Sequence, residues 1–506
     1  MSPNEKNNKK SSVFFLCCYF FLFSFIVLIG DVMRVNSLCR HLNLNYVTNN
    51  HFISGITDDS RYCINNSIFV AIKGNRIDGN KKIDEAIKNG AKTIFIEKEV
   101  IKRDGINFIY VENCKRTYAL MLSVYYKKIM KKIKIIGVIG TNGKTTTSTL
   151  IYKYLLSNNK KVMLIGSNGA YCRDYYRKHE NTTPGITELY NYFLYADDEK
   201  IDYLVMEVSS ISISELRVLG IDFDTLIFTN FSEDHLDYHK SMDLYFFDKS
   251  IPFIKLTKKN NAIINVDDDK GRNLIKYCNA KLFSYGFNSS RYKIKNIIES
   301  ENGISFNVNG IDYKSNLIGE FNAYNILPLF AIKDIYKLKK SLNEFLLEFS
   351  FVEGRMNRID VAYGNVIIDY AHTPCAVLKA ISAVSKICKG DLYVIVGCGG
   401  NREKEKRKKI GEILSNNKCI PIITSDNPRF ENPTTIINEI IAGMTIKPIS
   451  FIDRKEAILY ALNQMKINDY VLILGKGCEN YLDIRGIKEK YSDYEVVENW
   501  IYKTGE

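Results

Sequence analysis

The feature that most constrains the fold is an apolar run that leads into a glycine turn and then into a helix. Residues 133–139 read Ile-Lys-Ile-Ile-Gly-Val-Ile, the pattern of a buried strand, and Gly140-Thr-Asn-Gly-Lys-Thr-Thr-Thr147 follows at once. Gly140 and Gly143 let the backbone approach an anion, which the helix N-terminus and the Lys144 ammonium also face. A threonine hydroxyl next to this lysine is suited to hold Mg²⁺. The pattern predicts a phosphate-binding loop on a parallel α/β sheet.

The length of the chain requires several domains around this loop, because 506 residues exceed what one hydrophobic core serves. Residues 1–32 form an apolar N-terminal segment, and strands then alternate with helices in three stretches, predicting α/β domains at 33–132, 133–350 and 351–506. The second is predicted to be a P-loop ATPase with a mostly parallel sheet and a small antiparallel addition at 292–314. The third reads as a doubly wound, Rossmann-like sheet.

Composition excludes some classes of protein. The net charge is +13, but the densest basic run, residues 402–409, alternates with glutamates and is typical of a solvated face, so no nucleic-acid partner is predicted. The twelve cysteines include no Cys-x-x-Cys pair or ligand-spaced cluster. This pattern indicates free thiols in a reducing compartment, and neither a disulfide framework nor a zinc site.

The N-terminus allows two interpretations. Residues 13–30 are almost entirely apolar and follow the basic cluster 6–10, which is typical of a membrane anchor or signal peptide. Alternatively, translation begins at Met33 and residues 1–32 are never made. A membrane partner is expected only if residues 13–30 are expressed; otherwise the protein is expected in the cytoplasm, with membrane anchoring or organelle targeting as the alternatives.

Further motifs follow the loop in a fixed order. Met206-Glu-Val-Ser-Ser210 places a carboxylate at a strand end, Thr229-Asn-Phe-Ser-Glu-Asp-His-Leu-Asp-Tyr-His239 comes next, and Lys249 follows ten residues later. Asp369-Tyr-Ala-His-Thr-Pro374 ends a strand of the third domain. With Val138 in place of the first Walker glycine, this series resembles the Mur ligase and folylpolyglutamate synthetase superfamily, from about residue 54 to 485.

The resemblance implies ATP and Mg²⁺ as cofactors, and a carbamylated Lys249 that supplies an anionic oxygen ligand. It implies four metal ligands: Thr145, Glu207, His235 and Lys249. It implies four catalytic residues: Lys144, Lys249, Glu207 and His235. It implies an ATP site made of Gly140, Thr141, Asn142, Gly143, Lys144, Thr145, Thr146, Asn325, Arg355, Asp369 and His372, with Arg358 nearby.

The resemblance also implies two further substrate sites. The UDP-linked substrate is expected at Ser60, Asn181, Thr182, Thr183, Ser209, Arg217 and Lys249. The amino acid is expected at Arg402, Asp426, Asn427, Pro428, Arg429, Gly475 and Glu479. The segment Asp426-Asn-Pro-Arg429 resembles the variant in ligases that add meso-diaminopimelate rather than L-lysine. A guanidinium fork suits the distal carboxylate of that diamino acid.

The expected activity joins meso-diaminopimelate to UDP-N-acetylmuramoyl-L-alanyl-D-glutamate in peptidoglycan synthesis, through an acyl phosphate, and so serves cell-wall biogenesis, cell shape and division. A monomer is expected. Three alternatives stay open: a ligase adding lysine or D-Ala-D-Ala, a folate polyglutamating enzyme, and a non-catalytic scaffold. Ile211, Asn401 and Cys478 depart from the family pattern, which leaves fine selectivity and efficiency open but removes no metal or phosphate group.

Overall fold

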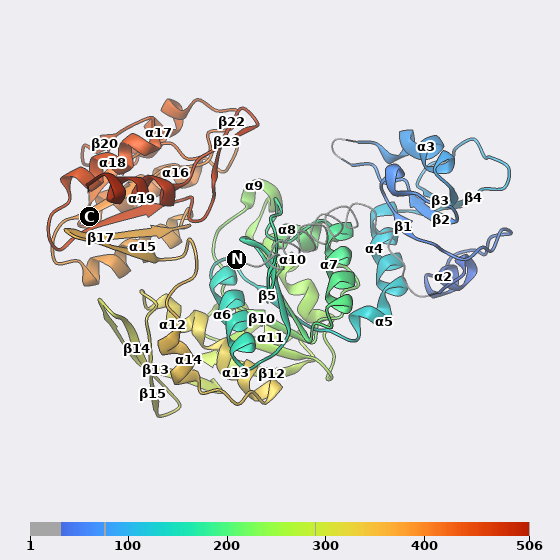
Figure 1. The fold of residues 1–506 in the computed structure, drawn as a ribbon, viewed down its shortest axis with the longest axis horizontal. Helices are drawn as coiled ribbons and strands as arrows, with labels where there is room; N and C mark the ends of the chain where they lie inside the picture. Colours follow the sequence, from blue (N-terminus) through green and yellow to red (C-terminus); the bar gives the residue numbers. More distant parts are fainter. Residues whose placement is uncertain (1–31, 75–76, 289, 505–506) are drawn as a thin grey trace, which may run out of the picture. The chain divides into compact units, whose positions relative to one another are not determined.

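The computed structural model describes residues 32–74, 77–288 and 290–504, which fold into two compact units (Figure 1). The first unit comprises the described residues up to Lys134 together with Pro184–Asp202 and Ser212–Asp222, and the second contains the remainder. The apolar segment 13–30 lies outside the described residues. Among the residues that are described, no helix has the length and apolar character needed to cross a membrane.

The first unit is built on a parallel sheet in the order β1-β2-β3-β4. Its strands are β1 (Ile56–Thr57), β2 (Ser67–Val70), β3 (Ala91–Ile96) and β4 (Asn107–Tyr110). Its helices are α2 (Val35–His41), α3 (Ile83–Lys88), α4 (Cys114–Tyr125), α5 (Lys127–Met130) and α7 (Ile186–Asp198). Phe69 and Ile94 are fully buried and lie in the small core beneath α3. The expected α/β alternation of this region is confirmed.

The second unit contains an eleven-stranded sheet around the predicted phosphate loop, in the order β15-β14-β13-β12-β11-β10-β5-β9-β6-β7-β8. Its central strands are β5 (Lys134–Ile139), β9 (Tyr203–Glu207), β10 (Thr225–Phe228), β11 (Asn261–Asn265), β12 (Lys281–Gly286) and β6 (Val162–Gly166). Its antiparallel margins are β13 (Tyr292–Ser300), β14 (Gly303–Val308) and β15 (Ile311–Ser315) on one side and β7 (Gly169–Cys172) and β8 (Tyr175–Arg177) on the other. The β13–β15 margin is the predicted antiparallel addition.

Helices accompany this sheet, and its central strands are buried. They are α6 (Lys144–Ser157), α9 (Leu236–His239), α10 (Met242–Ile254), α11 (Asp269–Ile275), α12 (Phe321–Ile326), α13 (Pro328–Tyr336) and α14 (Leu342–Glu348). The short helix α8 (Ser210–Ser214) begins in this unit, and its last three residues are assigned to the first unit. β10 pairs in parallel with both β5 and β11. The carboxyl ends of these strands therefore reach the same edge, where a parallel sheet binds ligands.

The second sheet of this unit has six strands in the order β16-β17-β21-β18-β19-β20, with only β16 antiparallel to its neighbour. They are β16 (Asn357–Val361), β17 (Gly364–Asp369), β18 (Leu392–Val396), β19 (Ile420–Ile423), β20 (Ile449–Ser450) and β21 (Asp469–Leu474). Its helices are α15 (Pro374–Ile387), α16 (Glu405–Ser415), α17 (Pro433–Ile441), α18 (Arg454–Gln464) and α19 (Asp493–Thr504).

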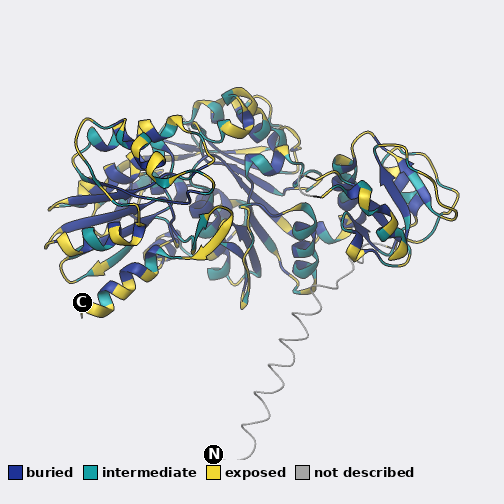
Figure 2. Cartoon of the chain, turned by 90° about the horizontal axis from the view of Figure 1, so that it is seen from above, coloured by how far each residue is buried: buried dark blue, intermediate teal, exposed yellow. Residues whose placement is uncertain are grey.

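Alternation along the strands explains the helical layers on both faces of this sheet. In β17, Ile367 belongs to the core formed with α15, α16 and α17, whereas Val366 and Ile368 belong to the core formed with α18 and α19. Successive strand residues point to opposite faces, so both faces need an apolar cover. Figure 2 shows the buried strands between helices whose outer faces are exposed. The α/β class with a central, mostly parallel sheet and a C-terminal Rossmann-like sheet is confirmed.

The basic run 402–409 is only partly the solvated face that was predicted. Arg402 and Lys408 are exposed, but Arg407 has a fully buried side chain. The prediction was wrong at this residue because Arg407 faces α17 and the loops before it, where carboxylates accept its hydrogen bonds. Among the described residues ten cysteines are free thiols.

A buried ion pair ties α18 and α19 to the end of β21. Arg454 donates from Nε and from one terminal nitrogen to the two Asp493 oxygens, each over 2.8 Å, and also to the Leu474 carbonyl over 2.8 Å. Both side chains are fully buried. Two charges removed from water stabilise a fold only as long as each keeps its partner.

Replacing Arg454 with Met is expected to lower the free energy of unfolding of this domain by about 3–5 kcal/mol, because the Asp493 carboxylate stays buried without a partner. The double variant Arg454→Met, Asp493→Leu removes both charges and is expected to recover most of that loss. Trp500, the single tryptophan, lies in α19, so its fluorescence in denaturant measures the effect. A single variant as stable as wild type would contradict this account.

Candidate functional site

The predicted phosphate loop lies between β5 and α6, and close packing fixes two of its glycines. A Cβ on Gly140 would lie 1.9 Å from the Thr229 Oγ1, and a Cβ on Gly143 would lie 2.3 Å from the Asn325 Oδ1. Gly143 also has a φ of 83°, a left-handed conformation that side chains disfavour. The loop therefore requires glycine at both positions, for packing at Gly140 and for packing and backbone conformation at Gly143.

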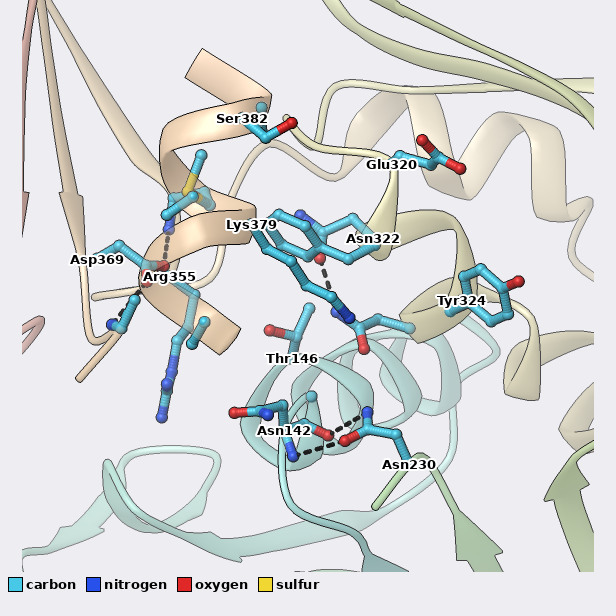
Figure 3. A pocket seen from close by; sticks show the side chains of 18 of the residues that line it. Asn142, Thr146, Asn230, Glu320, Asn322, Tyr324, Arg355, Asp369, Lys379 and Ser382 are labelled. Atoms are coloured by element: carbon cyan, nitrogen blue, oxygen red, sulfur yellow. Dashed lines mark hydrogen bonds between the residues drawn. The ribbon is translucent and has the colours of Figure 1, made fainter. Parts of the chain in front are cut away.

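Asn230 holds the same loop from the end of β10. Its Oδ1 accepts the Asn142 amide over 2.9 Å, and its Nδ2 donates to the Asn142 carbonyl over 3.0 Å (Figure 3). Asn230 was not among the predicted site residues, although it stands in the quoted segment 229–239. A side chain that bonds both polar groups of one peptide residue fixes the loop for anion binding.

Two predicted lysines meet at one backbone carbonyl. Lys144 donates from Nζ to the Gly140 and Thr141 carbonyls over 3.0 and 2.8 Å, and Lys249 donates to the Gly140 carbonyl over 2.7 Å. Lys249 comes from α10 and is buried. Burial, reinforced by the positive charge of Lys144, lowers the pKa of Lys249 well below its ordinary value. The environment therefore disfavours the charged form of Lys249.

Glu207, the last residue of β9, contacts the predicted metal-binding threonine. The Thr145 hydroxyl donates to its Oε2 over 3.0 Å, and the Ser167 amide donates to its Oε1 over 2.8 Å. Arg355, from the start of the C-terminal domain, donates to Thr145 Oγ1 over 2.9 Å. The geometry thus brings together a hydroxyl, a carboxylate and a guanidinium next to the phosphate loop.

His235 occupies a left-handed position with a φ of 54°, directly before α9. Burial lowers its pKa to about 4, although the carboxylate of Asp234 opposes that shift. The imidazole is therefore neutral at physiological pH, as a metal ligand must be. Asp234, which was not predicted, has a pKa below its ordinary value because His235, His372 and nearby lysines outweigh the effect of its own burial. Among the described residues no three His, Cys, Asp or Glu side chains form a metal-ligand group.

A cavity of about 710 Å³ opens beside the phosphate loop and is lined from both sheets of the second unit (Figure 3). The predicted ATP residues that line it are Asn142, Gly143, Thr146, Asn325, Arg355, Asp369 and His372. Arg358, expected nearby, instead bonds Asp360 and the Glu301 carbonyl and is not among the lining residues. Asn230, Tyr324 and Lys379 also line the cavity and were not predicted.

Asp369 and His372 lie at the end of β17, on the C-terminal side of this cavity. The two Asp369 oxygens accept the Met356 and Ala371 amides, each over 2.7 Å, and burial raises the pKa of the carboxyl group. His372 Nδ1 lies 2.9 Å from the Tyr370 carbonyl, and burial lowers the pKa of its ring. Asp369 therefore also holds the residue just before β16 and the loop just after β17.

The residues predicted for the UDP-linked substrate divide between the two units. Ser60 and Arg217 belong to the first, and Asn181, Thr182, Thr183 and Ser209 to the second. Within the second unit, Thr183 donates to the Glu207 carbonyl over 2.9 Å and accepts the Ser209 amide over 3.0 Å. Thr183 therefore connects this group of residues to the strand end that carries Glu207.

The residues predicted for the amino acid gather at strand ends of the C-terminal sheet. Asn427 donates to Glu479 Oε2 over 2.9 Å, and its Oδ1 accepts from Lys476 Nζ over 3.0 Å. Lys476 is fully buried and was not predicted, although it stands in the quoted segment 475–479. A Cβ on Gly475 would lie 2.7 Å from Asp426 Oδ2, so the backbone at Gly475 packs closely against the Asp426 side chain.

The two arginines predicted to recognise a carboxylate lie on adjacent loops. Arg429 donates to the Gly400 carbonyl over 2.8 Å and has a φ of 50°. Its amide and carbonyl bond the hairpin of β22 (Tyr481–Ile484) and β23 (Ile487–Lys490), at Asp483 and Arg485. Arg402 is half exposed, 3.8 Å from Asp237. Cys478, a departure from the pattern, donates to Asn168 Oδ1 over 2.9 Å.

A phosphate-binding loop that shares a cavity with a Rossmann-like domain defines a nucleotide-dependent enzyme. Comparison with known proteins identifies the class further. Residues 52–130 match the family model "Mur ligase family, catalytic domain", 138–332 match "Mur ligase middle domain", and 354–477 match "Mur ligase, glutamate ligase domain". The chain belongs to the Mur ligase family, whose members are ATP-dependent ligases.

Individual relatives agree with this assignment. The chain is 35% identical over 480 residues to UDP-N-acetylmuramoyl-L-alanyl-D-glutamate–2,6-diaminopimelate ligase of Phocaeicola vulgatus, covering 92% of this chain and 99% of that protein. A solved structure of a ligase with the same name has a TM-score of 0.66 and 27% identity, covering 90% of this chain and 96% of its own. MurF ligase from Thermotoga maritima in complex with ADP shares the fold, with a TM-score of 0.60 and 18% identity over 88% of this chain and 97% of its own.

Replacing Arg355 with Ala is expected to raise the KM for ATP by about 10- to 100-fold, because a charge-assisted hydrogen bond beside the phosphate loop is lost. Arg358→Ala is the matched control, since this guanidinium faces Asp360 and Glu301 and does not line the cavity. Initial rates at varied ATP concentration measure both. Equal KM values for the two variants would show that Arg355 has no part in nucleotide binding.

Proposed function

We propose that this chain joins 2,6-diaminopimelate to UDP-N-acetylmuramoyl-L-alanyl-D-glutamate with consumption of ATP, in peptidoglycan precursor synthesis. The observation that carries the proposal is Arg429, which lies on the Asp-Asn-Pro-Arg segment in a left-handed conformation, next to a network of Asn427, Lys476 and Glu479. A guanidinium matches a carboxylate, and lysine lacks the second carboxylate that diaminopimelate carries. The name of the Phocaeicola vulgatus relative supports this substrate.

The proposed reaction has two steps. The D-glutamyl γ-carboxylate oxygen attacks the γ-phosphorus of ATP, and ADP leaves. The free amine of the amino acid then attacks the acyl carbon, phosphate leaves with its bonding electrons, and the new amide nitrogen gives up a proton. Lys144 and the amides of the phosphate loop are proposed to hold the charge of the transferred phosphoryl group.

We propose that Mg²⁺ binds at Thr145, Glu207, His235 and Lys249. The Thr145 and Glu207 oxygens are 3.0 Å apart. Two adjacent ligands of an octahedral Mg²⁺, each at about 2.1 Å, are separated by about 3.0 Å, so this pair fits the ion. Bound Mg²⁺ would offset negative charge on the phosphates.

An unmodified lysine amine is a poor ligand for this ion, and we propose that Lys249 is carbamylated. The pKa of Lys249 is held well below its ordinary value by burial and by Lys144. Its neutral nitrogen can attack the carbon of CO₂, forming an N–C bond and releasing one proton. The carbamate would replace an amine beside a second positive charge with an anionic oxygen donor.

We further propose that residues 33–132, 133–350 and 351–506 form the domains for the UDP substrate, ATP and the amino acid. The residues named above for the UDP-linked substrate would bind its diphosphate and carboxylates. The ten cysteines in the described part of the chain are free thiols, which agrees with a reducing compartment, and we propose that the enzyme acts in the cytoplasm. We also propose that it is a monomer. Its product would then support cell-wall growth, cell shape and division.

Purified enzyme given ATP and the muramoyl dipeptide is expected to consume meso-diaminopimelate and to use L-lysine poorly. Arg429→Ala is expected to lower kcat/KM for diaminopimelate by about 10- to 100-fold, the value of a charged hydrogen bond, with little effect on lysine. Arg485→Gln is the control, because the Arg485 side chain is exposed and only its backbone contacts Arg429. Preference for lysine would favour the lysine-adding alternative, and no ATP turnover would favour a scaffold.

Protein incubated with ¹³C-bicarbonate is expected to show a lysine carbamate carbon by NMR, absent from Lys249→Gln. The same variant is expected to lose about 100-fold or more in kcat, because an anionic group beside the transferred phosphoryl is removed. Lys258→Gln, at an exposed position just after α10, is expected to keep both the signal and the rate. A carbamate signal that persists in Lys249→Gln would overturn this assignment.

A further inference from the structure

Arg407 is a buried charge that the proposed reaction does not use. It is the third residue of α16, and its side chain is fully buried. It donates to Glu431 through two hydrogen bonds of 2.8 and 3.0 Å, one from each terminal nitrogen. It also donates to Glu439 on α17 and, over 3.2 Å, to the Gly399 carbonyl. Hydrogen bonding and charge from the two glutamates outweigh its burial and keep its pKa above the ordinary value.

The bonds to Gly399 and Glu431 connect Arg407 to the two loops that carry the predicted amino-acid arginines. Gly399 lies three residues before Arg402, and Glu431 lies two residues after Arg429. Glu431 also accepts the Asn401 amide, and the Asn401 side chain in turn accepts the Phe430 amide over 3.1 Å. Arg407 therefore holds each loop directly and links them through a single carboxylate.

Both loops have backbone conformations that need external support. Asn401 has a φ of 53° and Arg429 a φ of 50°, in the left-handed region. Such conformations persist in a residue other than glycine when the surroundings determine them. A Cβ on Gly400 would lie 2.0 Å from the Pro428 carbonyl oxygen, so the two loops touch at backbone level. A small shift of one loop would move both guanidinium groups.

We propose that Arg407, through Glu431, is a positioning residue that sets the distance between the Arg402 and Arg429 guanidinium groups, and thereby the affinity for an amino acid with a distal carboxylate. This role rests on the proposed function, because it assumes that the two arginines bind that substrate. Arg407 acts only through other residues. Glu439 serves as its structural partner, because it contacts Arg407 from α17 without a bond to either loop.

The experiment compares two glutamates that share the same arginine. Glu431→Gln keeps the size of the side chain but weakens the link to both loops, and Glu439→Gln weakens the bond to α17 alone. Arg407→Lys retains a charge without the two-pronged geometry, and Lys408→Gln is an exposed control on the same helix. For each variant the KM for meso-diaminopimelate, ATP and the muramoyl dipeptide is measured with kcat, and Trp500 fluorescence in denaturant reports folding.

Glu431→Gln and Arg407→Lys are expected to raise the KM for diaminopimelate by about 10- to 100-fold, the usual cost of a misplaced binding group, and to leave the KM for ATP within about two-fold. Glu439→Gln is expected to unfold at lower denaturant with an unchanged KM for diaminopimelate. The proposal is overturned if Glu431→Gln and Glu439→Gln lose stability alike and neither changes that KM. If Arg407→Lys does not fold, the comparison of Glu431→Gln with Glu439→Gln still tests the proposal.

The wild-type enzyme in the same assay separates this proposal from the proposed function. Diaminopimelate-dependent turnover by wild type, together with unaltered KM values in the variants, overturns only the role of Arg407. Absence of that turnover in wild type overturns the proposed function and this role with it.

Discussion

The carbonyl oxygen of Gly140 accepts hydrogen bonds from two lysines, the partly buried Lys144 and the buried Lys249, and much of the site is arranged around that constraint. Two ammonium groups cannot both stay charged so close together without anions nearby. The carboxylates of Glu207 and Asp234 lie near Lys144 and favour its charged form. The pKa of Lys249, in contrast, is lowered well below its ordinary value. The Lys144 ammonium and the amides of the phosphate loop at the end of β5 are suited to the negative charge of a polyphosphate.

The second organising principle is the shared edge of each parallel sheet. β5, β9 and β10 deliver the phosphate loop, Glu207 and Asn230, while β17, β19 and β21 deliver Asp369, the Asp-Asn-Pro-Arg segment and Lys476. Each chemical group stands at the last residue of a strand or in the loop that follows it. Two arginines with fully buried side chains, Arg454 paired with Asp493 and Arg407 paired with Glu431, also donate to carbonyls at the strand ends and loops of the C-terminal sheet.

Much of this arrangement could be predicted from the sequence, because strand runs and glycine turns are local signals. The strand before Gly140, its helix and the antiparallel addition were all found in this way. The burial of Arg407 could not be predicted, because its run of alternating charges looks solvated and its partners Gly399, Glu431 and Glu439 come from other segments. Asn230 and Lys476 stood inside quoted motifs, but their roles depend on contacts with distant segments. Arg358 was expected near the nucleotide by resemblance alone, and its guanidinium instead bonds Asp360 and the Glu301 carbonyl.

The left-handed backbone at Arg429 limits how the choice of amino acid could change during evolution. A substitution there alters the group that we propose binds the distal carboxylate and, at the same time, the conformational preference of the loop. Asparagine or glycine would relax the backbone but remove the guanidinium. One residue thus affects both the proposed substrate selectivity and the shape of the loop. A change to another amino-acid substrate would therefore require compensating replacements in the hairpin β22–β23, which pairs with this residue.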